Sequence, residues 1–149
     1  MIKPPQTYSE WVEVFNILKA KTDDSAVLHA LQNGTIHWQE GVADRFIKRL
    51  IDAINARMSV ASNKFQKDLN NARGHEGHII QALLTLRKEM EFLSKAVNLP
   101  TIPSEKREQY YRLVRNQADR IQSSLEDSAK VDRTGKTTII VRNYKVNSF

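Results

Sequence analysis

The sequence contains no cysteine and little glycine or proline, with five Gly and four Pro in 149 residues. Without cysteine, the chain cannot form a disulfide framework, a zinc ribbon, an iron–sulfur site or a cysteine nucleophile. So few turn-forming residues are also atypical of a many-stranded β sandwich or a flexible linker protein. The composition therefore favours one soluble helical domain, large enough to bury a core without metal or disulfide staples.

The chain also lacks long apolar segments. No apolar run approaches the roughly 18 residues that a membrane-spanning helix needs. Residues 1–7 include two prolines and a lysine and have no apolar stretch typical of a secretory signal. We therefore expect no membrane association and a cytoplasmic location.

Capping signals and apolar spacing predict a helical hairpin over residues 1–34. Thr7 and Glu10 fit a capping box, and the apolar residues after them recur at helical spacing. A second short helix follows the polar cluster at 22–25, and we expect it to end at Gly34 in the left-handed conformation common at helix ends. The apolar stripes consist of Trp11, Val14, Phe15 and Leu18 in the first helix and Val27, Leu28 and Leu31 in the second.

Three longer segments share a coiled-coil-like repeat, in which apolar residues alternate at steps of three and four. Arg73-Gly74 separates the first two, and so short a connection favours antiparallel neighbours. We therefore predict an all-α fold, in which an antiparallel three-helix bundle and the amino-terminal hairpin form one domain over 1–130. The predicted long helices are 38–72, with Trp38 at its start, 76–97 and 104–129. In the first of these helices the repeat positions are Ile47, Ile51, Ile54, Met58, Ala61, Phe65 and Asp68 or Leu69. In the second they are Ile79, Leu83, Leu86, Met90, Leu93 and Val97. In the third they are Tyr111, Val114, Ala118, Ile121, Leu125 and Ser128.

Residues 131–149 have a different composition and are predicted to form a basic extended tail. The stretch 137–146 is rich in β-branched and aromatic residues, which is typical of a β-strand. No second strand is predicted, so the backbone groups of this strand would lack partners within the chain. They would be available to pair with a strand of another chain. The expected partner-binding residues are Ile139, Ile140, Val141, Arg142, Tyr144, Lys145 and Val146.

Positive charge is concentrated at the same end of the chain. The formal net charge is +6, and residues 130–149, with five basic side chains and one acid, carry +4 of it. A basic segment of this kind attracts anionic partners. The residues that would contact nucleic acid in that case are Arg133, Lys136, Arg142 and Lys145.

Two short motifs superficially suggest ligand chemistry. Thr134-Gly135-Lys136-Thr137 looks like the end of a phosphate-binding loop, but the glycine that the motif needs is replaced by Lys130, and a strand is expected to follow instead of a helix. His75-Glu76-Gly77-His78 looks like a zinc-protease motif, but its histidines are three positions apart instead of four. Both motifs are interpreted as turns.

Enzyme signatures are otherwise missing from the sequence. No Glu-x-x-His pair of a di-iron bundle and no Gly-x-Ser-x-Gly elbow occurs. We therefore predict no catalytic residues, no metal site and no cofactor. The predicted function is that of a non-enzymatic interaction or assembly protein that engages a protein partner or another copy through its carboxy-terminal strand, as a homo-oligomer in the latter case. The alternative is a nucleic-acid-associated factor that uses the basic tail.

Overall fold

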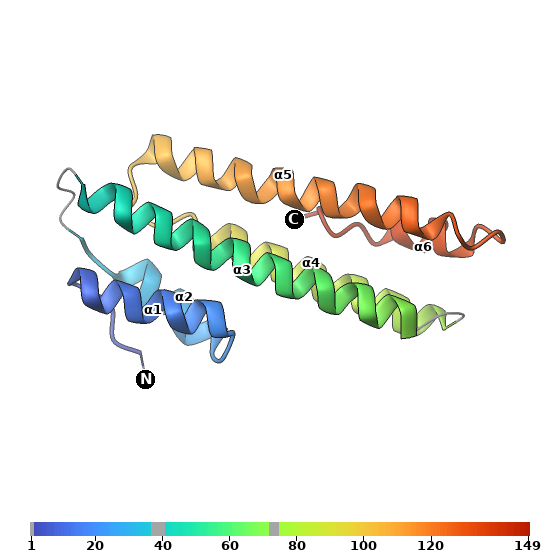
Figure 1. Cartoon of the computed structure of the whole chain (residues 1–149), viewed down its shortest axis with the longest axis horizontal. Helices are drawn as coiled ribbons and strands as arrows, with labels where there is room; N and C mark the ends of the chain where they lie inside the picture. The colour runs from blue at the N-terminus through green and yellow to red at the C-terminus, as the bar shows by residue number, and fades with distance from the viewer. Residues whose placement is uncertain (1, 37–40, 72–74) are drawn as a thin grey trace. The chain divides into compact units, whose positions relative to one another are not determined.

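The computed structural model describes residues 2–36, 41–71 and 75–149, and these contain six helices and no β-strand (Figure 1). The all-helical fold class is therefore confirmed. Trp38 and Arg73-Gly74, which helped to set the predicted helix boundaries, lie outside the described residues. The helices are α1 (Tyr8–Ala20), α2 (Asp24–Asn33), α3 (Val42–Asn71), α4 (Glu76–Ala96), α5 (Ser104–Ala129) and α6 (Lys136–Asn143).

The chain divides into two compact units, and the three long helices contribute to both. The first unit contains Met1–Ser59 and Lys95–Tyr111, and therefore α1, α2 and the beginning of α3. The second unit contains Val60–Ser94 and Arg112–Phe149, and therefore α6 with parts of α3, α4 and α5.

The amino-terminal helices begin where the sequence predicted. The Thr7 hydroxyl accepts a hydrogen bond from the Glu10 amide at 3.3 Å, and the Glu10 carboxylate accepts one from the Thr7 amide at 3.2 Å, so the capping box is confirmed. Asp23 caps α2 in the same manner by accepting from the Ala26 amide at 3.2 Å. The predicted pair of short helices is therefore present, and α1 and α2 pack against each other.

The expected left-handed end of α2 is wrong, because Gly34 has an extended backbone with φ −75° and ψ 157°. Glycine is needed at this position because any side chain would clash with neighbouring residues. A Cβ atom at this position would lie 2.6 Å from Cζ2 of Trp11 and 2.9 Å from Cγ of Pro5. The chain after α2 therefore passes directly against the Trp11 ring, which only a residue without a side chain permits.

An aromatic cluster forms the centre of the first unit. The Trp11 ring is fully buried and meets Phe46 edge-on, with the ring centroids 4.9 Å apart. Phe15 contacts both rings, at 5.9 Å from Trp11 and 5.1 Å from Phe46. The indole Nε1–H of Trp11 donates to the carbonyl of Thr35 at 2.8 Å, so the polar atom of this buried side chain is satisfied.

The predicted repeat positions on the long helices match the buried residues to different degrees. All six positions predicted for the second long helix are buried, five of them on α4 and Val97 directly after its end, which confirms the stripe. On α3, Ile54, Met58 and Phe65 are buried as predicted, and the intervening Arg57 is buried as well. On α5 the stripe begins at Tyr110 instead of Tyr111, which is 40% exposed.

The carboxy-terminal strand is the main error of the sequence prediction. Residues 136–143 form α6, and their β-branched side chains are accommodated because tertiary contacts outweigh intrinsic propensity. Ile140 and Val141 are buried in this helix, and α6 lies against α5 within the second unit, as the hydrogen bond from Gln122 to Val141 requires (Figure 1).

Candidate functional site

The carboxy-terminal segment, residues 130–149, is fastened to α5 by a buried glutamine. The Gln122 side chain is 4% exposed, and its Nε2 donates to the carbonyl of Val141 at 3.3 Å and to Glu126 Oε1 at 3.1 Å. Its Oε1 accepts from the amide of Val146 at 3.0 Å. One amide group thus provides hydrogen-bond partners for a carbonyl in the last turn of α6 and for an N–H beyond its end, both of which belong to buried residues.

Further polar contacts hold the last residues. Arg115 Nη1 donates to the carbonyls of Asn147 and Phe149, each at 2.9 Å, and the guanidinium lies 4.7 Å from the centroid of the Phe149 ring. Asn147 Nδ2 donates to Asp119 Oδ1 at 2.9 Å. The segment that was predicted to seek a partner elsewhere is therefore bonded to its own chain.

We expect Gln122→Leu to loosen the carboxy-terminal segment without unfolding the rest of the second unit. The substitution leaves the Val146 amide and the Val141 carbonyl without their partner, which should lower the local opening free energy by about 2 kcal/mol. Amide hydrogen exchange in α6 should then be roughly 30-fold faster. Gln117→Leu, at an exposed position of the same helix, is the matched control; equal exchange in the two variants would contradict the role of Gln122.

Helix formation changes which predicted partner-binding residues are accessible. Ile140, Val141 and Val146 are buried within the chain, and Tyr144 is half-buried. The alternation of two strand faces does not apply to these residues, because 136–143 is helical. The predicted residues that remain exposed are Ile139, Arg142 and Lys145.

All the predicted nucleic-acid contacts are exposed on the segment: Arg133, Lys136, Arg142 and Lys145. The remaining base of the segment, Lys130, is also exposed and lies 3.4 Å from Asp127 Oδ1. Because both partners of this pair are well exposed, the ion pair neutralises little of the local field. The segment therefore presents all its positive charges to solvent.

The only acid of the segment, Asp132, caps α6. Its Oδ1 accepts from the amide and hydroxyl of Thr134 at 3.0 and 2.7 Å, and its Oδ2 accepts from the amide and hydroxyl of Thr137 at 3.2 and 2.7 Å. The carboxylate thus occupies the position at a helix amino terminus where an external anion would bind. Although a helix does follow Thr134-Gly135-Lys136-Thr137, the chain supplies its own anion there.

These bonds hold the pKa of Asp132 well below its usual range; the hydroxyl of Thr134 contributes most, followed by that of Thr137. Because the folded pKa is lower than the unfolded value of about 3.9, the cap contributes stability above about pH 4 and loses it as the pH falls through the folded pKa. We therefore expect the Thr134 and Thr137 amide resonances to keep their positions between about pH 5 and about pH 3, where exposed carboxylates titrate. A transition of these resonances near pH 4 would contradict the cap.

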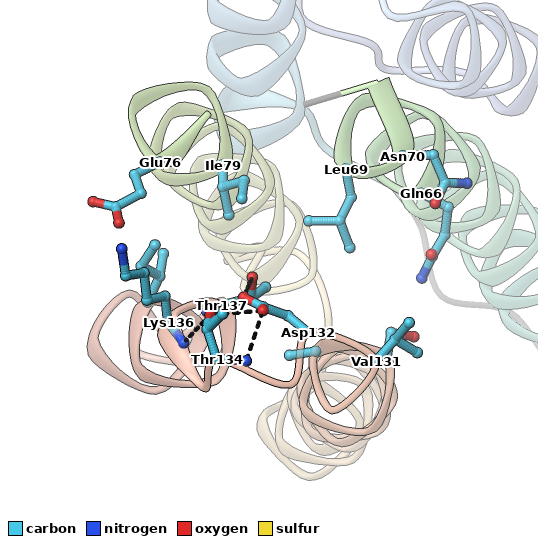
Figure 2. A pocket seen from close by; sticks show the side chains of 13 residues that line it. Gln66, Leu69, Asn70, Glu76, Ile79, Val131, Asp132, Thr134, Lys136 and Thr137 are labelled. Atoms are coloured by element: carbon cyan, nitrogen blue, oxygen red, sulfur yellow. Dashed lines mark hydrogen bonds between the residues drawn. The ribbon is translucent and has the colours of Figure 1, made fainter. Parts of the chain in front are cut away.

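A pocket of about 680 Å³ opens beside this cap in the second unit (Figure 2). Its walls come from the last turns of α3, the first turns of α4, the end of α5 and the beginning of α6. The lining residues are Gln66, Leu69, Asn70, Glu76, Ile79, Ser128, Ala129, Val131, Asp132, Thr134, Lys136, Thr137 and Ile140.

Further titratable groups are described at two other places in the structure. The rings of His75 and His78 are 5.4 Å apart and both residues are exposed. Burial, and to a smaller extent the charge of Asp44, raises the pKa of Tyr110 above its usual value. Within residues 2–36, 41–71 and 75–149, no group of three or more His, Asp or Glu side chains is placed to hold a metal ion.

Sequence reasoning missed the residues on α5 that bind the carboxy-terminal segment, as well as the pocket. Gln122, Arg115 and Asp119 all flank the predicted apolar stripe of α5, where polar residues are ordinarily solvated. Gln122 is the exception, because it is nearly inaccessible. No spacing signal links these residues to their bonding partners in the carboxy-terminal segment, which lie 19 to 34 positions later in the sequence.

Comparison with known proteins does not add a functional class. No protein-family model matches the chain, and no curated protein or solved structure matches it either. In the part of the chain that the structure describes, no helix combines the length and apolar character needed to cross a bilayer. The class that the fold defines is that of an all-helical protein with packed helices.

Proposed function

We propose that the chain is a non-enzymatic helical interaction protein that binds a protein partner through the solvent face of its carboxy-terminal segment. The observation that carries this proposal is the position of Ile139, which is 60% exposed on α6 between two cations. Lys136, Ile139 and Arg142 are spaced three residues apart and share one helix face. Strand addition is not retained, because the segment is helical.

The chemistry of this face favours a partner with acidic and apolar side chains. Val131, which precedes α6, is 78% exposed and adds a second apolar side chain to the segment. Exposed apolar residues beside charges of one sign are typical of interaction sites. A second copy of the chain would bring the same excess of positive charge to the interface, so an acidic partner is favoured over self-association.

The non-enzymatic part of the proposal is supported by the way Asp132 is engaged. Each of its two carboxylate oxygens already accepts two hydrogen bonds, one pair from Thr134 and the other from Thr137. A carboxylate in that state is a poor general base. In the same proposal, α3, α4 and α5 form an antiparallel bundle that serves as the scaffold for α6.

The absence of cysteine from the sequence allows a site-specific test. Ile139→Cys introduces a unique thiol to which a photo-activated crosslinker can be attached in the full chain, and crosslinking is then performed in cells that express it. Val60→Cys is the matched control, because Val60 is an equally exposed apolar residue, at 64%, on α3 of the same unit.

We expect a discrete acidic protein to crosslink at position 139 and not at position 60, and to be lost when Val131→Asp is added. Crosslinks to a second copy would overturn the choice of an acidic partner in favour of self-association. Equal crosslinking from both positions, or none from position 139, would overturn the proposed interaction face.

Nucleic acid is the second candidate partner, and it is favoured by the exposure of every basic side chain in the segment. If all five bases contact phosphates of duplex DNA, log affinity should fall with log salt with a slope of about −4.5, at about −0.9 per contact. That slope corresponds to a loss of about 500-fold between about 50 mM and about 200 mM salt. Fluorescence polarisation with random DNA and RNA measures it, and no binding at the lower salt would exclude this candidate.

A charge variant separates the two candidates. Replacing Arg142 and Lys145 by Gln should reduce the salt slope by about two contacts' worth, to about −2.7, if the ligand is duplex DNA. Val131→Asp with Ile139→Asp should instead abolish binding of a protein partner, because it removes the exposed apolar side chains.

A further inference from the structure

The pocket at the amino terminus of α6 is a second candidate site, which shares Val131 and Lys136 with the proposed interaction face but does not include Ile139 or Arg142. Its volume of about 680 Å³ is in the range of sites that hold small organic molecules. We propose that it binds a small zwitterion with an apolar group, in the class of α-amino acids with a large aliphatic or aromatic side chain.

Part of the pocket lining is apolar. Leu69 from the last turns of α3, Ile79 from α4 and Ile140 from α6 contribute branched side chains. Ala129 and Val131 extend the same surface at the end of α5. An aliphatic or aromatic group placed here would leave water for an apolar surface, which is the main source of affinity in such pockets.

The polar edge of the pocket carries two opposite charges side by side. Glu76 from the first turn of α4 and Lys136 from the first turn of α6 line the same side, and their charged ends point toward each other (Figure 2). Both residues are exposed, so each keeps its charge in contact with water. An α-amino acid presents a carboxylate and an ammonium group on one carbon, so Lys136 can bind the first while Glu76 binds the second.

The carboxylate of Asp132 and the hydroxyls of Thr134 and Thr137, which also line the pocket, are already engaged. Asp132 accepts hydrogen bonds from both Thr134 and Thr137, and these bonds form the cap of α6. The amino terminus of α6 is therefore occupied, and Glu76, the lining carboxylate outside this cap, has the ammonium group of Lys136 beside it, which disfavours a simple cation or anion. The ligand charges are left to Glu76 and Lys136, which favours a molecule with one charge of each sign.

Two amide side chains complete the site on the opposite side. Gln66 and Asn70 come from α3 and lie across the pocket from Glu76 and Lys136 (Figure 2). Each amide offers donors and acceptors, directly or through a bridging water. These two amides can therefore form hydrogen bonds with a polar atom on the apolar group of the ligand, such as an indole N–H or a phenol hydroxyl.

The test is a titration of the full chain, with Ile and Leu methyl groups isotopically labelled for NMR, using L-phenylalanine and L-leucine as probes. We expect saturable shifts at Leu69, Ile79 and Ile140. N-acetyl-L-phenylalanine lacks the ammonium group, L-phenylalaninamide lacks the carboxylate and L-serine lacks the apolar group. The first two should each bind about two- to fivefold more weakly than L-phenylalanine, as expected for the loss of one exposed ion pair. L-Serine should bind at least about tenfold more weakly, as expected for the loss of the apolar contact.

Variants assign the two charges. Glu76→Gln and Lys136→Gln should each weaken L-phenylalanine binding by about two- to fivefold. The charge swap that combines Glu76→Lys with Lys136→Glu should restore it, because the zwitterion can reverse its orientation. Lys145→Gln lies outside the pocket lining and is the control.

Saturable binding that depends on both charges would support the proposal. It would be overturned by shifts that do not saturate, by equal binding of the acetylated or amidated analogue, or by unchanged affinity in both charge-removal variants. Ile139 and Arg142 belong to the interaction face and do not line the pocket, whereas Val131 and Lys136 belong to both sites. A failed crosslink from position 139 therefore leaves this result unaffected.

Discussion

Trp11→Ala is expected to lower the free energy of unfolding of the first unit by about 3–5 kcal/mol, the usual range for truncating a large buried aromatic residue. The side chain is fully buried and forms the centre of the cluster with Phe15 and Phe46. Its removal would leave a cavity and would also leave the Thr35 carbonyl without the indole donor. Urea denaturation followed by hydrogen exchange in α1 and α2 measures the loss.

Trp11→Phe is the matched control for this prediction. It retains an aromatic ring beside Phe46 but removes the indole N–H that bonds Thr35 at 2.8 Å. We expect a smaller loss of about 1–3 kcal/mol, from the unsatisfied carbonyl and the reduced ring size. A loss below about 1 kcal/mol in Trp11→Ala would show that the aromatic cluster is not the core of this unit.

The helices of this protein could be predicted because their signals are local. Thr7 and Glu10 specify the start of α1 through a bond between neighbours in sequence. On α4 the apolar stripe from Ile79 to Leu93 is complete, and it therefore identifies both the helix and its buried face. Where the stripe of α5 is ambiguous, at Tyr110 and Tyr111, the sequence pattern selected the wrong member of the pair.

The carboxy-terminal helix could not be predicted because its determinants are distant or easily misread. The run from Thr137 to Val141 has the composition of a strand. What makes it helical is the Asp132 cap and the burial of Ile140 and Val141, which Gln122 supports from α5. A helix of this length is marginal without tertiary contacts, so those contacts decide the conformation.

The candidate sites were predictable only in part, for the same reason. The exposed charges at Arg142 and Lys145 follow directly from composition. Ile139 lies on the exposed face of a helix, and this face could not be identified because a strand was predicted for the segment. The pocket joins Glu76 to Lys136, which are far apart in the sequence, and no pattern along one element could reveal that juxtaposition.

Asp24→Ala should be the other strongly destabilising substitution, because it removes the ion-pair partner of the buried Arg57 in the first unit. Arg57 Nη1 and Nη2 donate to the two carboxylate oxygens of Asp24 at 2.9 and 3.1 Å, which ties the start of α2 to α3. The arginine side chain is only 1% exposed, whereas that of the aspartate is 35% exposed. The substitution removes a bidentate partner of this buried guanidinium. We therefore expect the free energy of unfolding of the first unit to fall by about 3 kcal/mol, the lower end of the range for breaking a buried ion pair.

A double-mutant cycle separates the contribution of the ion pair to stability from the cost of removing the aspartate while the buried arginine remains. Arg57→Met replaces the buried guanidinium with an apolar side chain of similar length, and combined with Asp24→Ala it should recover much of the loss, because burying two charges costs desolvation energy that an apolar contact does not. Urea denaturation of the wild type, both single variants and the double variant gives the coupling energy. If the double variant were as unstable as the sum of the single variants, the ion pair would not be the source of the effect, and packing around Arg57 would be.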